Sequence, residues 1–312
     1  MATYTLTTSV LTKLCAINQF SIPGVELVLF GIRGSVPVHT DDYSFQKEIQ
    51  LNLVDVDYTR LRCTMLQWKR STGQIASFPG STVPYIDSIK TAKKNNGAGT
   101  NCMITSYVKD FKKGIHKGKK KGNWHEAFVQ TEPRAYRRSA DNFSYDNNDR
   151  VEYENPGDNL HAAWTDSLDG KYSSEGCQVI LGMPKCANRI KSNPSATNTG
   201  AWAVVQKNAY AINQISFPYV LLTGYEVMSM ADRSDVPLQA KLRFGSSGPL
   251  VQALQNKLKK IAVFTGNSNG DFDGATLRAV LKFQQKNFGN QSADGIVGPN
   301  TASALGLNLP MI

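Results

Sequence analysis

The chain has 312 residues, more than a single hydrophobic core usually serves, and is therefore expected to form about two domains. Its 41% hydrophobic and 19% charged residues are typical of a folded protein and exclude a largely disordered one. No apolar run approaches the ~20 residues that a membrane-spanning helix needs, which excludes membrane insertion. The formal net charge of +10 favours a polyanionic partner.

Residues 1–21 are predicted to be a lead-in with one amphipathic helix that begins after Thr8 or Ser9. Its apolar residues recur at helical spacing: Val10, Leu11, Leu14 and Ile17. Pro23 and Gly24 are expected to end it. The N-terminus lacks the charged start and apolar stretch of a secretory signal. We therefore expect synthesis in the cytoplasm, and any action outside it is expected to need a non-classical delivery route.

Residues 22–228 are rich in β-branched and aromatic runs bounded by Gly, Pro, Asn or Ser. The predicted strands lie at 25–30, 61–68, 102–108, 128–130 and 219–224. Residues 78–84 are interpreted as a turn, and short helices are predicted at 184–190 and 201–210. This pattern predicts a mixed, mainly β domain.

Residues 229–240 are polar and are interpreted as a linker to a separate helical bundle at 241–312. Pro249 opens the first apolar stripe, Asp273 is the predicted N-cap of the second helix, and Pro299 opens a third. The stripes are Leu250, Val251, Leu254, Leu258 and Ile261, then Thr276, Leu277, Val280 and Phe283. The fold class expected for the whole chain is therefore α+β with several domains.

The bundle resembles a known family. Residues 242–248, 270–276 and 294–301 are similar in content, order and spacing to the opening, central repeat and close of the three-helix peptidoglycan-binding domain. The resemblance covers 241 to about 307 and implies bacterial peptidoglycan as the partner.

The chemistry is predicted to lie at Cys177. Ser174 and Gly176 precede it closely, and His161 stands sixteen positions earlier. A cysteine nucleophile needs a base to form thiolate at neutral pH, and a glycine beside it lets substrate approach the backbone. The remaining cysteines are interpreted as packing residues: Cys15, Cys63, Cys102 and Cys186.

This constellation resembles the signature of the L,D-transpeptidase catalytic domain, a mainly β fold. The resemblance implies acyl transfer, with Cys177 as nucleophile, His161 as base and the backbone N–H groups of Gly176 and Cys177 as candidate oxyanion donors. Ser174 is expected to bond within the turn or to orient His161. Two positions depart from the family: the signature has a histidine where Glu175 stands and an arginine where Val179 stands.

Further substrate contacts are predicted at His116, Trp164 and Arg33. His116 lies in the segment 109–125, whose seven lysines are interpreted as a solvated loop or as a rim that attracts anionic wall polymer. No helix-turn-helix or aromatic-basic pattern supports nucleic acid as a partner.

A zinc peptidase is the competing enzyme class. His116, His125 and His161 combine in principle with an aspartate such as Asp166, but no compact ligand spacing is present. The prediction is therefore no metal and no cofactor.

The sequence thus predicts a wall-targeted cysteine enzyme that cleaves or exchanges stem-peptide bonds between L and D centres. The resemblance leaves cross-link formation by transpeptidation as an alternative, and a non-catalytic wall-binding component of a phage or injection particle as another. Because no secretory signal is visible, action at the cell wall or in the periplasm is expected to follow delivery by phage lysis or contractile-injection machinery. Hydrolysis is then favoured over transfer by analogy with phage endolysins and injected wall effectors of similar architecture, since a delivered wall enzyme usually damages the wall.

Overall fold

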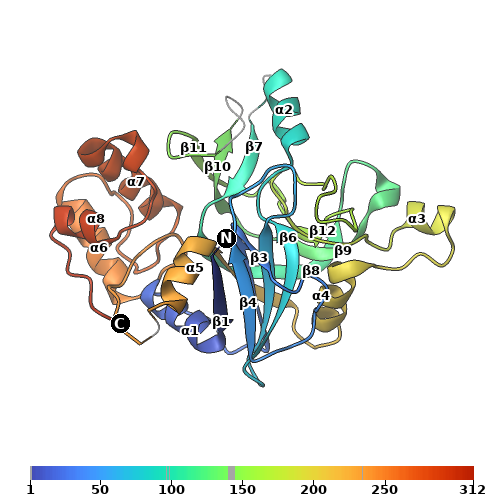
Figure 1. Ribbon diagram of the computed structural model, residues 1–312. Coiled ribbons are helices and arrows are strands. Elements are labelled where there is room, and N and C mark those ends of the chain that lie inside the picture. Colours follow the sequence, from blue (N-terminus) through green and yellow to red (C-terminus); the bar gives the residue numbers. More distant parts are fainter. Residues whose placement is uncertain (1, 96, 98, 140–144, 234) are drawn as a thin grey trace.

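The computed structural model describes residues 2–95, 97, 99–139, 145–233 and 235–312 and shows a β-barrel with a helical module at its side (Figure 1). The barrel closes in the order β12-β13-β6-β5-β2-β14-β8-β9. Its strands are β2 (Leu27–Arg33), β5 (Cys63–Lys69), β6 (Gln74–Ser81), β8 (Ser106–His116), β9 (His125–Gln130), β12 (Leu160–Ala162), β13 (Gln178–Ile180) and β14 (Ser216–Thr223). Most neighbours are antiparallel, whereas β12 and β13, like β2 and β14, run parallel.

Strand β2 is apolar along most of its length because both of its faces are buried. In β2, Leu27 and Leu29 pack into the cluster that fills the barrel, whereas Val28, Phe30 and Ile32 pack into a second cluster outside it. Successive side chains of a strand point to opposite faces, so a continuous apolar run is the pattern that a strand between two layers requires.

The second cluster is covered by a small sheet and two helices. The sheet has the order β1-β4-β3, with β1 (Thr3–Thr7), β4 (Glu48–Leu53) and β3 (Ser35–Pro37). The helices are α1 (Thr8–Ile17) and α5 (Gly224–Ala231). The predicted lead-in helix is thus present as α1, but a strand precedes it that the sequence analysis did not predict.

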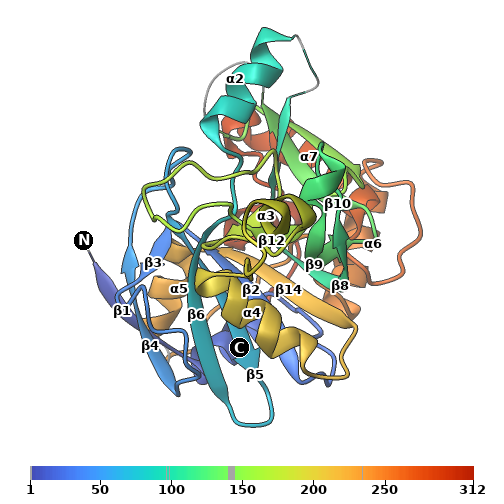
Figure 2. The same cartoon turned by 90° about the vertical axis from the view of Figure 1, so that its right-hand side faces the viewer.

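The remaining elements surround the barrel mouth and its flank. A third sheet has the order β11-β10-β7, with β11 (Arg150–Glu154), β10 (Arg134–Ser139) and β7 (Thr100–Met103). The helices are α2 (Ile86–Lys94), η1 (Lys121–Asn123), α3 (Ala187–Ser192) and α4 (Gly200–Tyr210). Figure 2 shows α4 lying across the barrel beside β6.

The C-terminal module contains α6 (Pro249–Lys260), α7 (Gly274–Phe288), η2 (Asn290–Ser292) and α8 (Pro299–Leu305). Pro249 occupies the first turn of α6, and Asp273 caps α7 by accepting the backbone N–H of Thr276, as the sequence predicts. Two buried glutamines form the same kind of hydrogen bond to a loop glycine. The Gln255 side chain accepts the N–H of Gly270, and the Gln284 side chain accepts the N–H of Gly295. Each amide therefore fixes a glycine loop beside its helix.

The module is docked on the barrel, whereas the sequence suggested a separate bundle. Backbone bonds join Lys241 to Ile17 and Tyr107 to Phe244, and one hydrophobic cluster runs through both parts. A buried ion pair between Arg243 and Glu226 crosses the junction. Burial raises the pKa of Glu226, but the charge and hydrogen bond of Arg243, the charge of Lys241 and the Thr223 N–H together lower that pKa to about 2.

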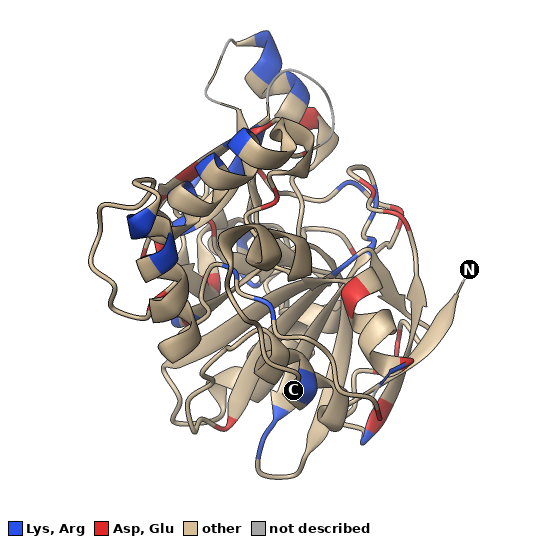
Figure 3. Ribbon diagram, turned by 90° about the vertical axis from the view of Figure 1, so that its left-hand side faces the viewer, with Lys and Arg blue, Asp and Glu red and all other residues tan. Residues whose placement is uncertain are grey.

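The outer side of the module carries positive charge. Arg278, Lys282 and Lys286 are exposed on α7 at four-residue spacing and therefore share one face of the helix. Figure 3 views this side of the molecule, with Lys and Arg in blue. Strands β9 and β12 lie on the other side of the barrel from the module (Figure 1).

The α+β composition predicted from the sequence is confirmed, and several local predictions are corrected. Residues 78–81 belong to β6, so only 82–84 bend away. The predicted strand at 102–108 is two strands, β7 and β8, and Lys109 to His116 lie in β8 rather than in a loop. The linker predicted at 229–240 begins in α5, which continues to Ala231. No helix in the described part of the chain is long and apolar enough to cross a membrane.

Candidate active site

Four neighbouring strands bring the candidate residues together. His116 ends β8 and lies opposite His125, the first residue of β9. Strand β9 pairs with β12, which carries His161, and β12 pairs with β13, which Cys177 directly precedes. Barrel closure therefore gathers at one mouth side chains from three separate parts of the sequence.

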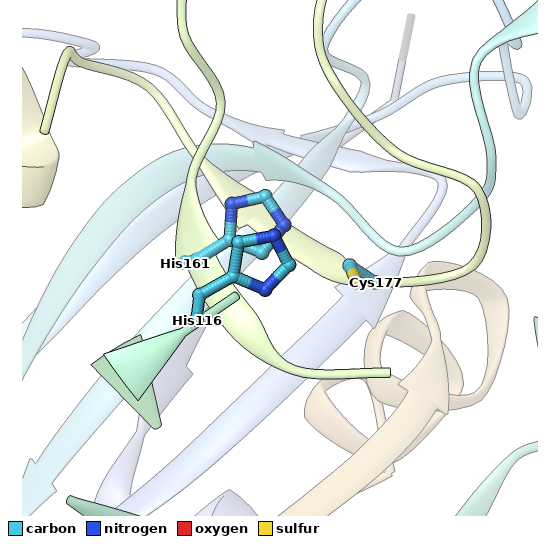
Figure 4. Close-up of side chains that lie close together, drawn as sticks. All are labelled: His116, His161 and Cys177. Carbon is cyan, nitrogen blue, oxygen red and sulfur yellow. The ribbon is translucent and has the colours of Figure 1, made fainter. Parts of the chain in front are cut away.

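These side chains line a cleft of about 770 Å³, together with residues from the 117–123 loop, the start of α2 and the 171–175 loop. Cys177 and His161 lie deep within it, with 8% and 2% of their surfaces exposed. One ring nitrogen of His116, one of His161 and the Cys177 Sγ all lie within 4.8 Å of one another (Figure 4). The His116 and His161 rings stack with centroids 4.0 Å apart.

The hydrogen bonds of His161 determine its tautomer. Its Nδ1 lies 2.7 Å from the carbonyl oxygen of Ala162, which only accepts, so Nδ1 carries the proton. Burial lowers the pKa of His161 well below its usual range, and the neighbouring His116 and His125 lower it further. His161 is therefore a neutral imidazole with a free lone pair on Nε2, as a general base requires.

His116 has the opposite tautomer. The backbone N–H of Gln130 donates to Asn159 Oδ1 at 2.9 Å, which leaves the Asn159 Nδ2 group to donate to His116 Nδ1 at 2.9 Å. Because Nδ1 accepts, the ring proton of neutral His116 lies on Nε2. Burial and the nearby His125 lower the pKa of His116 to about 4, so the ring is neutral at neutral pH.

The thiol is held in its protonated form. Burial raises the pKa of Cys177 well above its usual range, and the carboxylate of Asp158, whose Oδ1 lies 3.9 Å from the Sγ, raises it further. A backbone hydrogen bond from Asn159 acts in the opposite direction. The free cleft therefore contains a neutral thiol beside a neutral imidazole, rather than a thiolate–imidazolium pair.

Asp158 is the site residue that the sequence analysis missed. It is 7% exposed, lines the cleft and accepts a hydrogen bond from Asn101 at 2.8 Å. Burial raises its pKa to about 6, against an ordinary value of 3.8. The sequence shows that Asp158 stands directly before Asn159 and two residues after Pro156, but it does not show that Asp158 is buried. Carboxyl groups with perturbed pKa values of this kind cluster at functional sites.

Ser174 and Gly176 build the turn that presents the thiol. The Ser174 hydroxyl donates to the Cys177 carbonyl at 2.8 Å and accepts the Gly176 N–H at 3.2 Å. Gly176 has φ +151°, and a Cβ there would lie 2.5 Å from Asp158 Oδ2, so only glycine fits. Ser174 thus bonds within the turn, while the Ala162 carbonyl orients His161.

The turn leaves only one of the two predicted backbone oxyanion donors available. The N–H of Gly176 is already engaged by Ser174. The N–H of Cys177 has no acceptor among the described residues. Of the pair predicted from the sequence, Cys177 is therefore the candidate that remains.

Trp164 lies in the cleft and Arg33 does not. Trp164 has φ +64°, which is uncommon for a non-glycine residue, and its ring packs against the His125 ring in a T-shaped arrangement with centroids 5.5 Å apart. The Arg33 guanidinium instead donates to Thr82 Oγ1 and to the carbonyls of Thr82 and Met103. Arg33 thus braces the barrel and is not among the residues that line the cleft, and its contact with substrate stays a prediction from the sequence.

The two departures from the resembled signature have different surroundings. Glu175 is exposed on the cleft rim and forms an ion pair with Lys119 at 2.6 Å, which joins the 117–123 loop to the 171–175 loop. Val179 is fully buried in β13, where it pairs with His161 on one side and Ser81 on the other.

The remaining cysteines are all buried and free: Cys15, Cys63, Cys102 and Cys186.

The cluster of His116, His161 and Cys177 also has the residue types that hold zinc. Asn159, however, engages the Nδ1 lone pair of His116 and leaves a proton on Nε2, so this ring must exchange its hydrogen bond before it binds an ion. The Nε2 of His125 is buried with no partner in the described part of the chain. Asp166, the fourth ligand considered from the sequence, instead accepts a hydrogen bond from Thr199.

Comparison with known proteins identifies the helical module. Residues 247–305 match the family model named "Putative peptidoglycan binding domain". The match spans α6 to α8, which supports association with the cell wall and peptidoglycan as a binding partner. No curated protein and no solved structure matches the chain.

Proposed function

We propose that the protein is a peptidoglycan-active enzyme that cleaves stem-peptide bonds between L and D centres through an acyl-enzyme on Cys177. The observation that carries the proposal is the buried thiol in a cleft beside His161, whose Nε2 lone pair is left free by the Ala162 carbonyl. The peptidoglycan-binding module supplies the substrate class. A likeness of the barrel to the L,D-transpeptidase fold belongs to the same proposal.

In this mechanism, the Cys177 sulfur attacks the peptide carbonyl while the thiol proton passes to His161 Nε2. The tetrahedral oxyanion accepts a hydrogen bond from the free N–H of Cys177. Collapse breaks the C–N bond, and the His161 imidazolium returns its proton to the leaving amine. Water then attacks the thioester with His161 again as base, which releases the peptide acid and restores the thiol.

Asp158 helps to keep the Cys177 thiol protonated in the resting enzyme. Its carboxylate disfavours thiolate in the free cleft, so proton transfer accompanies attack on a bound carbonyl. An exposed thiolate is oxidised more readily than a thiol, and a protein that acts outside the cytoplasm gains from a thiol held in its protonated form.

The test is digestion of purified murein by the full chain and by Cys177→Ala, with products identified by mass spectrometry. We expect new peptide termini with the wild-type chain and none with Cys177→Ala, whereas Cys186→Ala, which changes another buried cysteine, keeps the activity. Full activity of Cys177→Ala would falsify the cysteine mechanism, and loss of activity on chelation would favour zinc.

The products also separate the alternatives. Exchanged or cross-linked peptides in place of new carboxyl termini would indicate transpeptidation, in which an amine replaces water as acceptor. Binding to murein without any covalent change would favour the non-catalytic wall-binding component. Delivery by phage lysis or injection machinery stays a prediction from the sequence.

A further inference from the structure

The two stacked histidines beside the thiol present different groups to the cleft. In His161 the Nδ1 proton is donated to the Ala162 carbonyl, so the remaining nitrogen accepts. In His116 the Nδ1 accepts from Asn159, so the remaining nitrogen donates. Two rings in contact, each with one nitrogen near the Cys177 sulfur, therefore offer the cleft a base and a hydrogen-bond donor.

The donor character of His116 depends on a chain of hydrogen bonds that starts at the backbone. The Gln130 N–H can only donate, and it therefore identifies the Asn159 atom that it meets as the oxygen. The other end of the amide is then an NH2 group, which also only donates. Asn159 is thus a positioning residue that selects the Nε2–H tautomer of His116.

The Nε2–H group is available to a ligand. It has no hydrogen-bond partner among the described residues and, unlike the His125 Nε2, it is not sealed from solvent. It faces Gly118, a cleft-lining residue at which a Cβ would lie 3.7 Å from it. Burial lowers the pKa of His116 to about 4, so the ring is neutral at neutral pH. His116 therefore offers an N–H donor without a positive charge that would favour thiolate before substrate binds.

The geometry points to His116 as an electrophilic catalytic residue, whose Nε2–H donates to the oxyanion that forms when Cys177 attacks a carbonyl. This role rests on the acyl transfer proposed above and goes beyond it. The His116 Nε2–H takes the place of the Gly176 N–H as an oxyanion donor, because the Gly176 N–H is already bonded to Ser174 within the turn. No proton is transferred: the Nε2–H bond persists while the carbonyl oxygen gains and then loses its negative charge. Together with the Cys177 N–H, the cleft then supplies two donors.

Two reactions of the same thiol separate this role from a structural one. Acylation by p-nitrophenyl acetate passes through an oxyanion, whereas alkylation by iodoacetamide does not. In the full-length chain, we expect His116→Ala to slow acylation of Cys177 by about 100- to 1,000-fold, the usual loss for one oxyanion donor, and to leave alkylation nearly unchanged.

Three comparisons complete the experiment. His116→Gln, whose amide offers an N–H near the position of Nε2, is expected to restore part of the acylation rate. His161→Ala is expected to slow both reactions because it removes the base. His39→Gln, which changes an exposed histidine outside the cleft, is expected to slow neither.

Equal losses in both reactions for His116→Ala, or no loss in either, would overturn the assignment. So would nitrogen-15 spectra that place the His116 proton on Nδ1 in the free protein. If the ester acylates Cys177 but murein is not cut, the proposed substrate fails while the role of His116 stands. If the wild-type thiol accepts no acyl group at all, both fail together.

Discussion

Replacing Asp158 by asparagine is expected to stabilise the fold at neutral pH. Burial raises the pKa of this carboxyl from 3.8 to about 6, which means that folding penalises its charged form. The difference between about 6 and 3.8, at 1.36 kcal/mol per pH unit, gives a penalty of about 3 kcal/mol at pH 7. Asparagine keeps an oxygen that accepts from Asn101 and carries no charge, so it avoids most of this penalty.

The sign of the pH dependence follows from the same values. The folded pKa of Asp158 lies above the unfolded one, so the folded state binds the proton more tightly. The penalty is therefore absent below pH 3.8 and complete above pH 6. The stability gain of Asp158→Asn is therefore expected to shrink by about 1.5 kcal/mol between pH 7 and pH 5.

Urea unfolding at the two pH values measures this difference directly. Asp87→Asn is the matched control, because Asp87 also lines the cleft but is exposed and paired with Lys171 on the surface; its effect is expected to stay within about 0.5 kcal/mol. A variant of Asp158 that is less stable than the wild type at pH 7, or a gain that does not shrink on acidification, would refute the reasoning.

Further predictions concern the reactivity of the cleft. Because the Asp158 carboxylate raises the pKa of Cys177, Asp158→Asn is expected to speed alkylation of Cys177 by iodoacetamide at pH 7, as followed by mass spectrometry; slower alkylation would contradict this. In NMR titrations the His116 ring is expected to gain its second proton near pH 4, and a midpoint near 6.5 would show that it is not buried as described. Lys117 and Lys120 line the cleft without a carboxylate partner among the described residues. Changing either to methionine is expected to raise KM for stem peptides with free carboxylates, to leave kcat unchanged, and to have no effect on amidated peptides.

Helix starts and buried strands that are marked by neighbouring residues in the sequence were predicted correctly. Pro249 and Asp273 mark helix starts because the first turn of a helix leaves N–H groups without partners, and both stand at those positions. The run at 25–30 predicted a buried strand and is β2, two residues further on. The spacing of His161 and Cys177 also predicted their proximity, because β12 and β13 are adjacent and joined by one connection.

The rest of the site depends on pairings that no local pattern specifies. His116 meets Asn159 across 43 positions of sequence because β9 lies between β8 and β12 in the barrel. The sequence analysis therefore predicted His116 as a substrate contact, but it did not predict the contact with Asn159 that sets its tautomer. Asp158 was overlooked for the same reason, since its raised pKa results from burial by residues distant in sequence.

Glu175 and Val179, the two positions that depart from the L,D-transpeptidase signature, have surroundings that explain the difference. Glu175, which stands where that signature has a histidine, turns outward to pair with Lys119 and leaves no imidazole on the thiol's own loop. A second imidazole nevertheless lies beside the thiol, because β8 delivers His116 into contact with His161. An arginine in place of Val179 would have to bury its guanidinium between β12 and β6, at a cost of several kcal/mol without a partner. Under the proposed function, substrate carboxylates are therefore expected to be recognised by the lysines of the rim, so that their substitution changes KM while that of His116 changes the chemical step.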